Sequence, residues 1–282
     1  MKIYIVIPAH NEAENIFRTL ESLTSQSLLP KKLVVVDDQS TDSTASIVER
    51  FSEKFPFVRL VKSLSSEAHL PGSKVINAFH KGLKQLDEEY DVICKFDADL
   101  IFPKHYLASL AAHFEADKSL GMCGGFCQVQ VRGKWVLESL TGKDHIRGAL
   151  KAYRKACYKD IGGLKASMGW DTVDELLAQY HGWKIKTDPN LLVKHLRPTG
   201  FTYNKTAKWK QGEAFYKLRY GWLITIIASV KLALKKKEPR LVLDYLQGFQ
   251  KAKASKMPFL VSEKEGAFIR RLRYKKMLSK FF

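Results

Sequence analysis

The stretch IYIVIPAHNE at residues 3–12 decides the fold class of this chain. Residues 3–7 are β-branched and aromatic, and no charge interrupts them, which is typical of a strand buried on both faces. Pro8 ends this run, and His10, Asn11 and Glu12 follow it closely. The stretch therefore predicts a buried first strand with polar side chains gathered at its carboxyl end.

The residues after this strand repeat one pattern, an amphipathic helix followed by a short apolar strand. Repeated β-α-β units of this length predict an α/β fold with a mostly parallel sheet flanked by helices. The expected strands are 3–7, 33–36, 58–61, 92–96 and 191–194, and the expected helices are 15–23, 43–51, 75–86, 149–158 and 172–181.

Polar clusters follow three of the expected strands. They are His10-Asn11-Glu12, Asp37-Asp38 and Asp97-Ala98-Asp99. In an open parallel sheet the carboxyl ends of the strands form the ligand-binding edge, so the pattern predicts one site with acidic walls. The first turn lacks both the P-loop and the GxGxxG fingerprint, which argues against an ATPase or a nicotinamide dehydrogenase. Paired carboxylates such as Asp97 and Asp99 suit Mg²⁺ or Mn²⁺.

Composition separates the chain into two regions. Of 282 residues, 45% are hydrophobic, which excludes disorder as the main state. Lys and Arg number 47 against 29 Asp and Glu, a formal net charge of +18. Residues 205–282 hold 20 basic and 5 acidic residues, or +15, which leaves 27 minus 24, or +3, for residues 1–204. We therefore expect a nearly balanced domain over 1–204 and a basic, amphipathic helical extension over 205–282.

Six motifs in order resemble family 2 glycosyltransferases of the GT-A fold, over about the first 200 residues. They are IVIPAHNE at 5–12, VVVDDQSTD at 34–42, Asn77, Asp97-Ala98-Asp99, Gly162-Gly163-Leu164 and Gly169-Trp170-Asp171. The resemblance implies a GT-A domain, a nucleotide-sugar donor and dependence on a divalent metal ion.

The resemblance also implies roles for residues near the strand ends. Pro8, Glu12 and Asp38 would form the nucleoside pocket, and Asp97 would also contact the nucleotide sugar. Lys74 and Asn77 would meet the diphosphate at the start of their helix, although Lys74 could equally be a solvated surface lysine.

Further residues complete the site that the resemblance implies. Asp97, Asp99 and His195 would hold Mg²⁺ or Mn²⁺, although a lone histidine is more often structural. Asp171 corresponds to the general base, while Trp170 replaces the acid that usually precedes it. Asp174 and Glu175 are alternative bases. Asp171 could also be the N-cap of its helix, and we expect a capping role for Asp42.

The resulting expectation is an inverting, metal-dependent glycosyltransferase. It would move a sugar from a nucleotide-diphosphate donor, a UDP-sugar by preference, to a hydroxyl of a glycan or a lipid-linked acceptor. One alternative is transfer to polyprenyl phosphate, which needs no base. Another is an inactive GT-A scaffold that binds membrane or nucleic acid, against which the intact Asp97, Asp99 and Asp171 argue.

Aromatic and apolar residues alternate with many cations after residue 204. This mixture predicts helices that lie in an anionic membrane interface. Nucleic-acid binding is the less favoured interpretation, and a solvated helical cap is the third. No signal peptide or membrane-spanning run is evident, and four cysteines in apolar or mixed contexts fit reduced thiols. We expect a cytoplasmic protein, peripheral on the inner face of the cell membrane.

Overall fold

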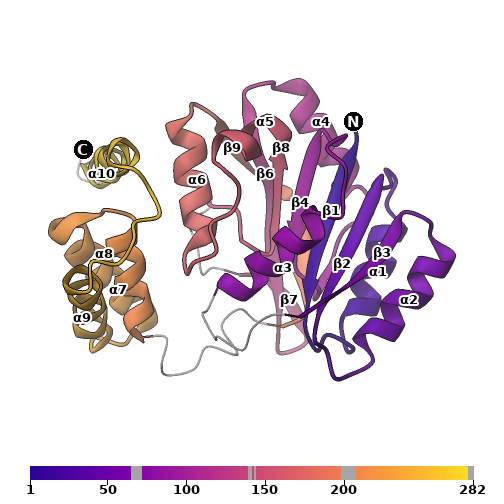
Figure 1. The fold of residues 1–282 in the computed structure, drawn as a ribbon, viewed down its shortest axis with the longest axis horizontal. Helices are drawn as coiled ribbons and strands as arrows, with labels where there is room; N and C mark the ends of the chain where they lie inside the picture. The colour runs from indigo at the N-terminus through magenta and orange to yellow at the C-terminus, as the bar shows by residue number, and fades with distance from the viewer. Residues whose placement is uncertain (65–71, 139–141, 143, 198–207, 279–282) are drawn as a thin grey trace.

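A computed structural model describes residues 1–64, 72–138, 142, 144–197 and 208–278. One sheet with the strand order β3-β2-β1-β4-β8-β6-β9-β5, from which β7 extends beside β6, forms the centre of the molecule (Figure 1). The strands are β1 (Ile3–Ala9), β2 (Lys32–Asp38), β3 (Val58–Ser63), β4 (Val92–Phe96), β5 (Leu100–Ile101), β6 (Leu120–Val131), β7 (Lys134–Leu137), β8 (Leu150–Arg154) and β9 (Lys184–His195). The helices are α1 (Ile16–Thr24), α2 (Thr44–Lys54), α3 (Ser73–Leu83), α4 (Tyr106–Ala116), α5 (Lys155–Asp160), α6 (Trp170–Tyr180), α7 (Lys208–Lys217), α8 (Gly221–Lys236), α9 (Leu241–Ala254) and α10 (Glu263–Leu278).

The first half of the sheet is the predicted parallel α/β unit. Strands β3, β2, β1 and β4 pair in parallel. The central residues of β2, β1 and β4 are buried, whereas the edge strand β3 exposes Arg59 and Lys62. Burial on both faces is what a parallel strand between two helical layers requires, and it explains the apolar runs in the sequence. All polar clusters of the predicted site follow the carboxyl ends of these strands.

The second half of the sheet is mixed. Strand β8 is antiparallel to β4 and to β6, and β9 is parallel to β6. The predicted helix 149–158 is wrong, because this stretch forms β8 and only then the short helix α5. The prediction failed because the partner that buries Lys151 and Tyr153 comes from α6, about 20 residues further along the chain. Both are fully buried in β8, where Asp174 accepts hydrogen bonds from their side chains.

No element was expected between residues 104 and 148, yet α4, β6 and β7 lie there. A glycine of β6 lets a neighbouring strand approach, since a Cβ on Gly125 would lie 2.0 Å from the Leu191 carbonyl oxygen of β9.

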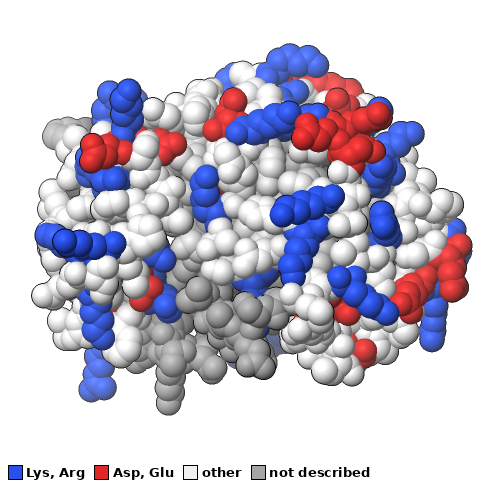
Figure 2. All heavy atoms as spheres, viewed as in Figure 1, with Lys and Arg blue, Asp and Glu red and all other residues white. Residues whose placement is uncertain are grey.

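The C-terminal helices α7 to α10 form a group beside α6, on the side of the sheet away from β3 (Figure 1). Their buried residues, such as Phe215, Tyr220 and Ile269, belong to the same hydrophobic cluster as the sheet. In the view of Figure 2, Lys and Arg side chains project from this helical part with a few acidic side chains between them. The predicted domain boundary after residue 204 lies outside the described residues.

Within the described ranges, no helix combines the length and the apolar content needed to cross a membrane.

Candidate active site

The carboxyl ends of β1 and β2 lie side by side and bring Pro8 close to two aspartates. Ala9 pairs with Asp37 in the parallel register. Asp38 ends β2, and its Oδ1 accepts a hydrogen bond from the Ser63 hydroxyl at 3.1 Å. The structure thus places Pro8 and Asp38, two residues of the predicted nucleoside pocket, at one edge of the sheet.

Asp37 is a further polar residue at this edge. Asp37 is only 5% exposed, and its Oδ1 has no hydrogen-bond partner among the residues that the structure describes. A buried carboxylate oxygen without a donor destabilises the folded state unless a ligand supplies one. Asp37 is therefore a candidate, besides Asp38, for accepting an N–H of a nucleotide base.

Asp42 lies one residue before Ser43, the N-cap of α2, so it is not the N-cap itself. Its carboxylate accepts hydrogen bonds from the backbone N–H of Thr44 at 2.9 Å and of Ala13 at 3.0 Å. It holds the turn after β1 against the start of α2.

Glu12 is linked to the predicted metal site through an arginine. Its carboxylate forms an ion pair with Arg197, whose Nε lies 3.4 Å from Asp99 Oδ2. Burial raises the pKa of Glu12 above its usual value, and the Arg197 charge offsets part of this effect. One guanidinium therefore joins the predicted nucleoside pocket to the aspartates that follow β4.

Asp99 and His195 come together although 95 residues separate them in the chain. Strand β5 pairs with the end of β9 so that Leu100 lies opposite His195. As a result, Asp99 Oδ2 is 3.4 Å from His195 Nε2, and both residues are largely buried. Burial lowers the pKa of His195, but hydrogen bonding to Asp99 and Glu138 raises it to about 9.

Asp97 is oriented differently from Asp99. Its carboxylate accepts a hydrogen bond from Lys95 Nζ, and its backbone N–H donates to the Ala149 carbonyl at 2.9 Å. About a third of the Asp97 side chain is exposed, at 34%, whereas that of Asp99 is 10% exposed. Asp97 is therefore the more accessible of the two aspartates, and Asp99 is the more buried.

A divalent cation fits part of the predicted ligand set. Asp99 offers a carboxylate oxygen and His195, once metal binding has displaced its proton, an imidazole nitrogen, both of which Mn²⁺ accepts as ligands. Behind the imidazole, Glu138 Oε2 lies 3.6 Å from His195 Nδ1, the position from which a carboxylate orients a ligating histidine. Among the described residues, the compact group of potential ligand atoms is Cys127, Glu138 and His195, all within 4.8 Å of one another. His195 is common to both sets.

Three acidic residues open α6, and they differ in their surroundings. Lys151 Nζ lies 2.8 Å from Asp174 Oδ1 and 3.2 Å from Glu175 Oε1, with all three side chains buried. Asp171 Oδ2 lies 3.6 Å from His145 Nε2, and its side chain is 35% exposed. Asp171 is therefore the carboxylate of the three that faces solvent.

The pKa values of this cluster follow from its burial and charges. Burial raises the pKa of Asp171, but hydrogen bonding to His145 and the charge of Lys151 outweigh it and lower the pKa to about 2. For Asp174, burial dominates and raises the pKa to about 6. Asp171 is thus ionised at neutral pH. It is not the N-cap of α6, because the helix begins at Trp170 and Gly169 precedes it in a left-handed conformation.

Gly148 joins the two halves of the site. Its carbonyl accepts a hydrogen bond from Lys95 Nζ at 3.1 Å, on the side of Asp97. A Cβ at this glycine would lie 2.9 Å from the Trp170 ring and 3.2 Å from Asp171 Cβ. The missing side chain therefore lets the start of α6 approach the Asp97 loop.

Lys74 and Asn77 lie on the first two turns of α3, at the carboxyl edge of the parallel strands. Lys74 is half-buried and Asn77 is exposed. The described structure shows no contact from either side chain to Asp38, Asp97 or Asp99. Residues 65–71, directly before this helix, are outside the described part of the chain.

Sequence reasoning missed Glu138, His145, Arg147 and Lys151. Arg147 Nη1 lies 3.1 Å from Glu138 Oε2, so these residues connect the His195 side of the site to the His145 side. Three of the four lie in irregular backbone between β7 and β8, where no periodicity marks a position as buried.

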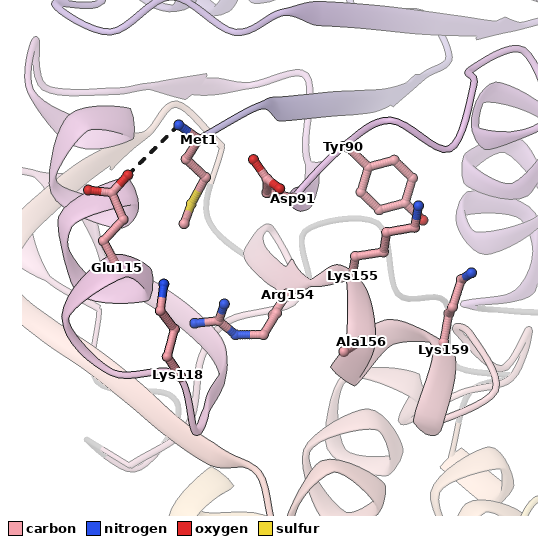
Figure 3. Close-up of a pocket in the computed structure, with 9 residues that line it drawn as sticks. All are labelled: Met1, Tyr90, Asp91, Glu115, Lys118, Arg154, Lys155, Ala156 and Lys159. Atoms are coloured by element: carbon pink, nitrogen blue, oxygen red, sulfur yellow. Dashed lines mark ion pairs between the residues drawn. The ribbon is translucent and has the colours of Figure 1, made fainter.

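A separate cavity of about 600 Å³ lies at the opposite end of the sheet (Figure 3). Met1 and Asp91 line it at the amino ends of β1 and β4, with Lys118, Arg154 and Lys159 around them. It is not part of the site described above.

The fold and this strand-edge site define the class of protein. The model of the family described as Glycosyl transferase family 2 matches residues 4–156, more than half of the chain. The chain therefore belongs to glycosyl transferase family 2.

Two curated relatives are similar over most of this chain. Poly-beta-1,6-N-acetyl-D-glucosamine synthase of Staphylococcus epidermidis is 26% identical over 259 residues, which is 82% of this chain and 59% of that protein. A protein of Bacillus subtilis named probable glycosyltransferase YdaM is 37% identical over 244 residues, or 78% of this chain and 57% of that protein. The chain thus spans less than two thirds of the length of these relatives.

Solved structures share the fold. S. aureus TarS 1–349 in complex with UDP-GlcNAc has a TM-score of 0.56 at 24% identity, over 80% of this chain and 66% of TarS 1–349. The mannosyltransferase PcManGT from Pyrobaculum calidifontis, in complex with GDP-Man and Mn²⁺, has a TM-score of 0.58 at 17% identity, over 98% and 80% of the two chains. The predicted GT-A architecture is confirmed.

Proposed function

We propose that this glycosyltransferase moves a sugar from a nucleotide-diphosphate donor, a UDP-sugar, to a hydroxyl of a glycan or a lipid-linked acceptor. The observation that supports this most strongly is the convergence at Gly148. There the Asp97 loop and Asp171 approach each other from opposite sides. A donor diphosphate and an acceptor hydroxyl require such neighbouring sites, one for a metal ion and one for a base.

Similar proteins favour this donor class. TarS was solved with UDP-GlcNAc, PcManGT with GDP-Man and Mn²⁺, and a curated relative makes poly-beta-1,6-N-acetyl-D-glucosamine. We assign the binding of the donor's nucleotide base to the edge formed by Pro8, Asp38 and Glu12. We assign the binding of its diphosphate to Asp97, Lys74 and Asn77. Lys74 lies in the first turn of α3, where backbone N–H groups favour anions, and this supports the assignment.

The proposed metal ligands are Asp99, His195 and the more accessible Asp97. A bound Mg²⁺ or Mn²⁺ would neutralise the charge that develops on the diphosphate as it leaves. The Glu138 carboxylate lies beside Nδ1 of His195 and orients its ring. The Arg197 guanidinium offsets the negative charges of Glu12 and Asp99.

We assign the general base to Asp171. Its carboxylate takes the proton of the acceptor hydroxyl while the acceptor oxygen forms a bond to the anomeric carbon. The bond between that carbon and the diphosphate oxygen breaks in the same step, so the nucleoside diphosphate leaves and the configuration inverts. His145 and Lys151 keep Asp171 ionised before the reaction.

The C-terminal helices carry the second part of the proposal. We infer that residues 205–282 are a basic extension that brings the enzyme to an anionic membrane surface, where a lipid-linked acceptor would lie. The cytoplasmic location that we expect from the sequence stays a prediction.

A donor panel tests the proposed reaction. Wild-type protein is incubated with UDP-GlcNAc, other UDP-sugars and GDP-mannose, with Mn²⁺, with Mg²⁺ or with EDTA, and the released nucleoside diphosphate is measured. We expect release from one UDP-sugar with metal, and inversion at the anomeric carbon in the product. Release from GDP-mannose alone would overturn the donor assignment, and equal release with EDTA would overturn the metal assignment.

A further inference from the structure

Helix α8 turns a largely apolar face to solvent. The exposed large apolar side chains along it are Trp222, Leu223, Ile226, Ile227, Val230 and Leu234, and Leu234 is 73% exposed. Lys231, Lys235 and Lys236 of the same helix are exposed as well. At 3.6 residues per turn the apolar positions share one side of the helix. Exposed apolar surface that is contiguous over a whole helix marks an interaction site rather than ordinary protein surface.

The inner face of the same helix is less apolar than the outer face. Its buried residues are Ile224, Thr225, Ser229 and Ala233. The hydroxyls of Thr225 and Ser229 each donate to a backbone carbonyl one turn earlier, at 2.7 Å. A helix that only capped the fold would place its large aliphatic residues inward, so the sequence of α8 is arranged for an apolar medium outside the protein.

Basic residues gather in the second half of α8 and just after it. Lys231, Lys235 and Lys236 belong to the helix, and Lys237 and Arg240 follow it, whereas Glu238 is the only acidic residue between 221 and 240. Trp222 lies at the other end, with its ring 4.6 Å from that of Phe249. An aromatic residue, an exposed aliphatic face and neighbouring cations are the composition of a helix that lies in an anionic bilayer interface.

We propose that α8 is the membrane-docking element, with its apolar face lying in the plane of an anionic lipid bilayer. A helix of 16 residues is about 24 Å long and shorter than the roughly 30 Å hydrocarbon core, so it lies in the interface rather than across it. A second copy of this chain is a poorer occupant, because it would bring the same cluster of positive charges to the contact. This inference rests on the part of the proposed function that brings residues 205–282 to an anionic membrane surface, and it names the element that makes the contact.

Vesicle co-sedimentation of the full chain tests this assignment. The docking variant is Ile226→Gln/Val230→Gln/Leu234→Gln, in which each replaced side chain is exposed. The matched control is Leu29→Gln/Leu192→Gln, which removes exposed apolar side chains elsewhere on the molecule. Vesicles contain phosphatidylcholine alone or with phosphatidylglycerol, and thermal melts verify that every variant is folded.

We expect wild type and control to bind the anionic vesicles, more weakly as salt rises, and the docking variant to bind about 10- to 100-fold less. Brominated lipid chains should quench wild-type fluorescence more than that of Trp222→Phe. Equal vesicle binding by the docking variant and wild type would overturn the proposal. So would tighter binding to a DNA oligonucleotide, or a dimer without lipid that the docking variant abolishes.

UDP binding distinguishes a failure of the docking proposal from a failure of the proposed reaction. UDP-induced stabilisation in Mn²⁺ should be the same in the docking variant and in wild type, since α8 holds none of the site residues. If the wild type binds vesicles through α8 but releases no nucleoside diphosphate from any donor, the proposed reaction fails and the docking assignment stands.

Discussion

One turn of α6 gives three neighbouring carboxylates different chemistry. Asp174 and Glu175 are buried against Lys151, and the Asp174 carboxylate also accepts a hydrogen bond from the Tyr153 hydroxyl at 2.5 Å. Asp171 meets His145 and solvent instead. A base must reach a substrate proton, so the structure favours Asp171 over the two alternatives that the sequence left open.

Asp171→Asn should lower the transfer rate by about 10²- to 10⁴-fold, because the amide cannot take a proton. The dissociation constant of UDP should stay nearly unchanged, since a base acts on the acceptor in the transition state. Steady-state kinetics and UDP titration measure the two effects separately.

Asp174→Asn is the control for this prediction. It removes a charge from a buried ion pair, so it should destabilise the fold by a few kcal/mol, about 3, rather than act on the chemical step alone. Near wild-type turnover in Asp171→Asn would contradict the assignment and would favour an acceptor that is already ionised.

His145 predicts a pH dependence of stability. Burial lowers its pKa, but hydrogen bonding to Asp171 and Glu175 raises it to about 9 from 6.5. A raised pKa stabilises the folded state fully below pH 6.5, and this contribution is lost as the pH rises through about 9. The free energy of unfolding of wild type minus that of His145→Gln should therefore fall by roughly 2 to 3 kcal/mol across this range.

Denaturant unfolding at several pH values measures that difference. Leu29→Gln is a suitable control, because it changes no titratable group. A difference between wild type and His145→Gln that stays constant with pH would contradict the charge assigned to His145.

Part of the site could be predicted from single residues, and part could not. Asp99 and His195 follow strands, and strand ends meet at one edge, so their proximity follows from the pattern. Glu138 and Arg147 lie in irregular backbone, where their partners are fixed only by tertiary packing. The side-chain direction of Asp97, toward Lys95, was equally invisible in the sequence.

At the scale of elements, β8 shows where pattern reading fails. Lys151 and Tyr153 lie among apolar residues in a stretch that suits a helix, yet both side chains are buried because α6 supplies the partner Asp174. Local propensity is a weak preference that such a contact overrides. Strands β1, β2 and β4 were predictable, because burial on both faces leaves a continuous apolar run.

The contact between α7 and α9 depends on two glycines. A Cβ at Gly212 would lie 1.9 Å from the Tyr245 carbonyl oxygen, and one at Gly248 would lie 2.1 Å from the Trp209 carbonyl oxygen. Gly248→Ala should therefore destabilise the protein by about 1 to 3 kcal/mol, although alanine favours helices.

Thermal and denaturant unfolding check this value. Gln250→Ala on the same helix is the control, because its side chain is exposed and its loss should change stability by less than about 0.5 kcal/mol. Equal stability of both variants would show that α7 and α9 are further apart than the structure places them.

At the scale of the whole molecule, most of the net positive charge lies in a different part of the chain from the predicted active site. Residues 1–204 carry +3 and the predicted site, whereas residues 205–282 carry +15. Removing the basic region would not leave the rest intact, because its buried residues share the hydrophobic cluster of the sheet. Point variants on α8 are therefore a sharper test of its role than truncation.

The central claim is that the edge formed by β1, β2 and β4 binds a nucleoside diphosphate together with a divalent metal ion at Asp99 and His195. Calorimetric titration of UDP into wild type and Asp99→Asn, each in Mn²⁺ and in EDTA, tests it most directly. We predict that wild type binds UDP at least about 10-fold more tightly in Mn²⁺ than in EDTA, and that Asp99→Asn loses this difference. Equal UDP affinity in Mn²⁺ and in EDTA, or an unchanged metal effect in Asp99→Asn, would contradict it.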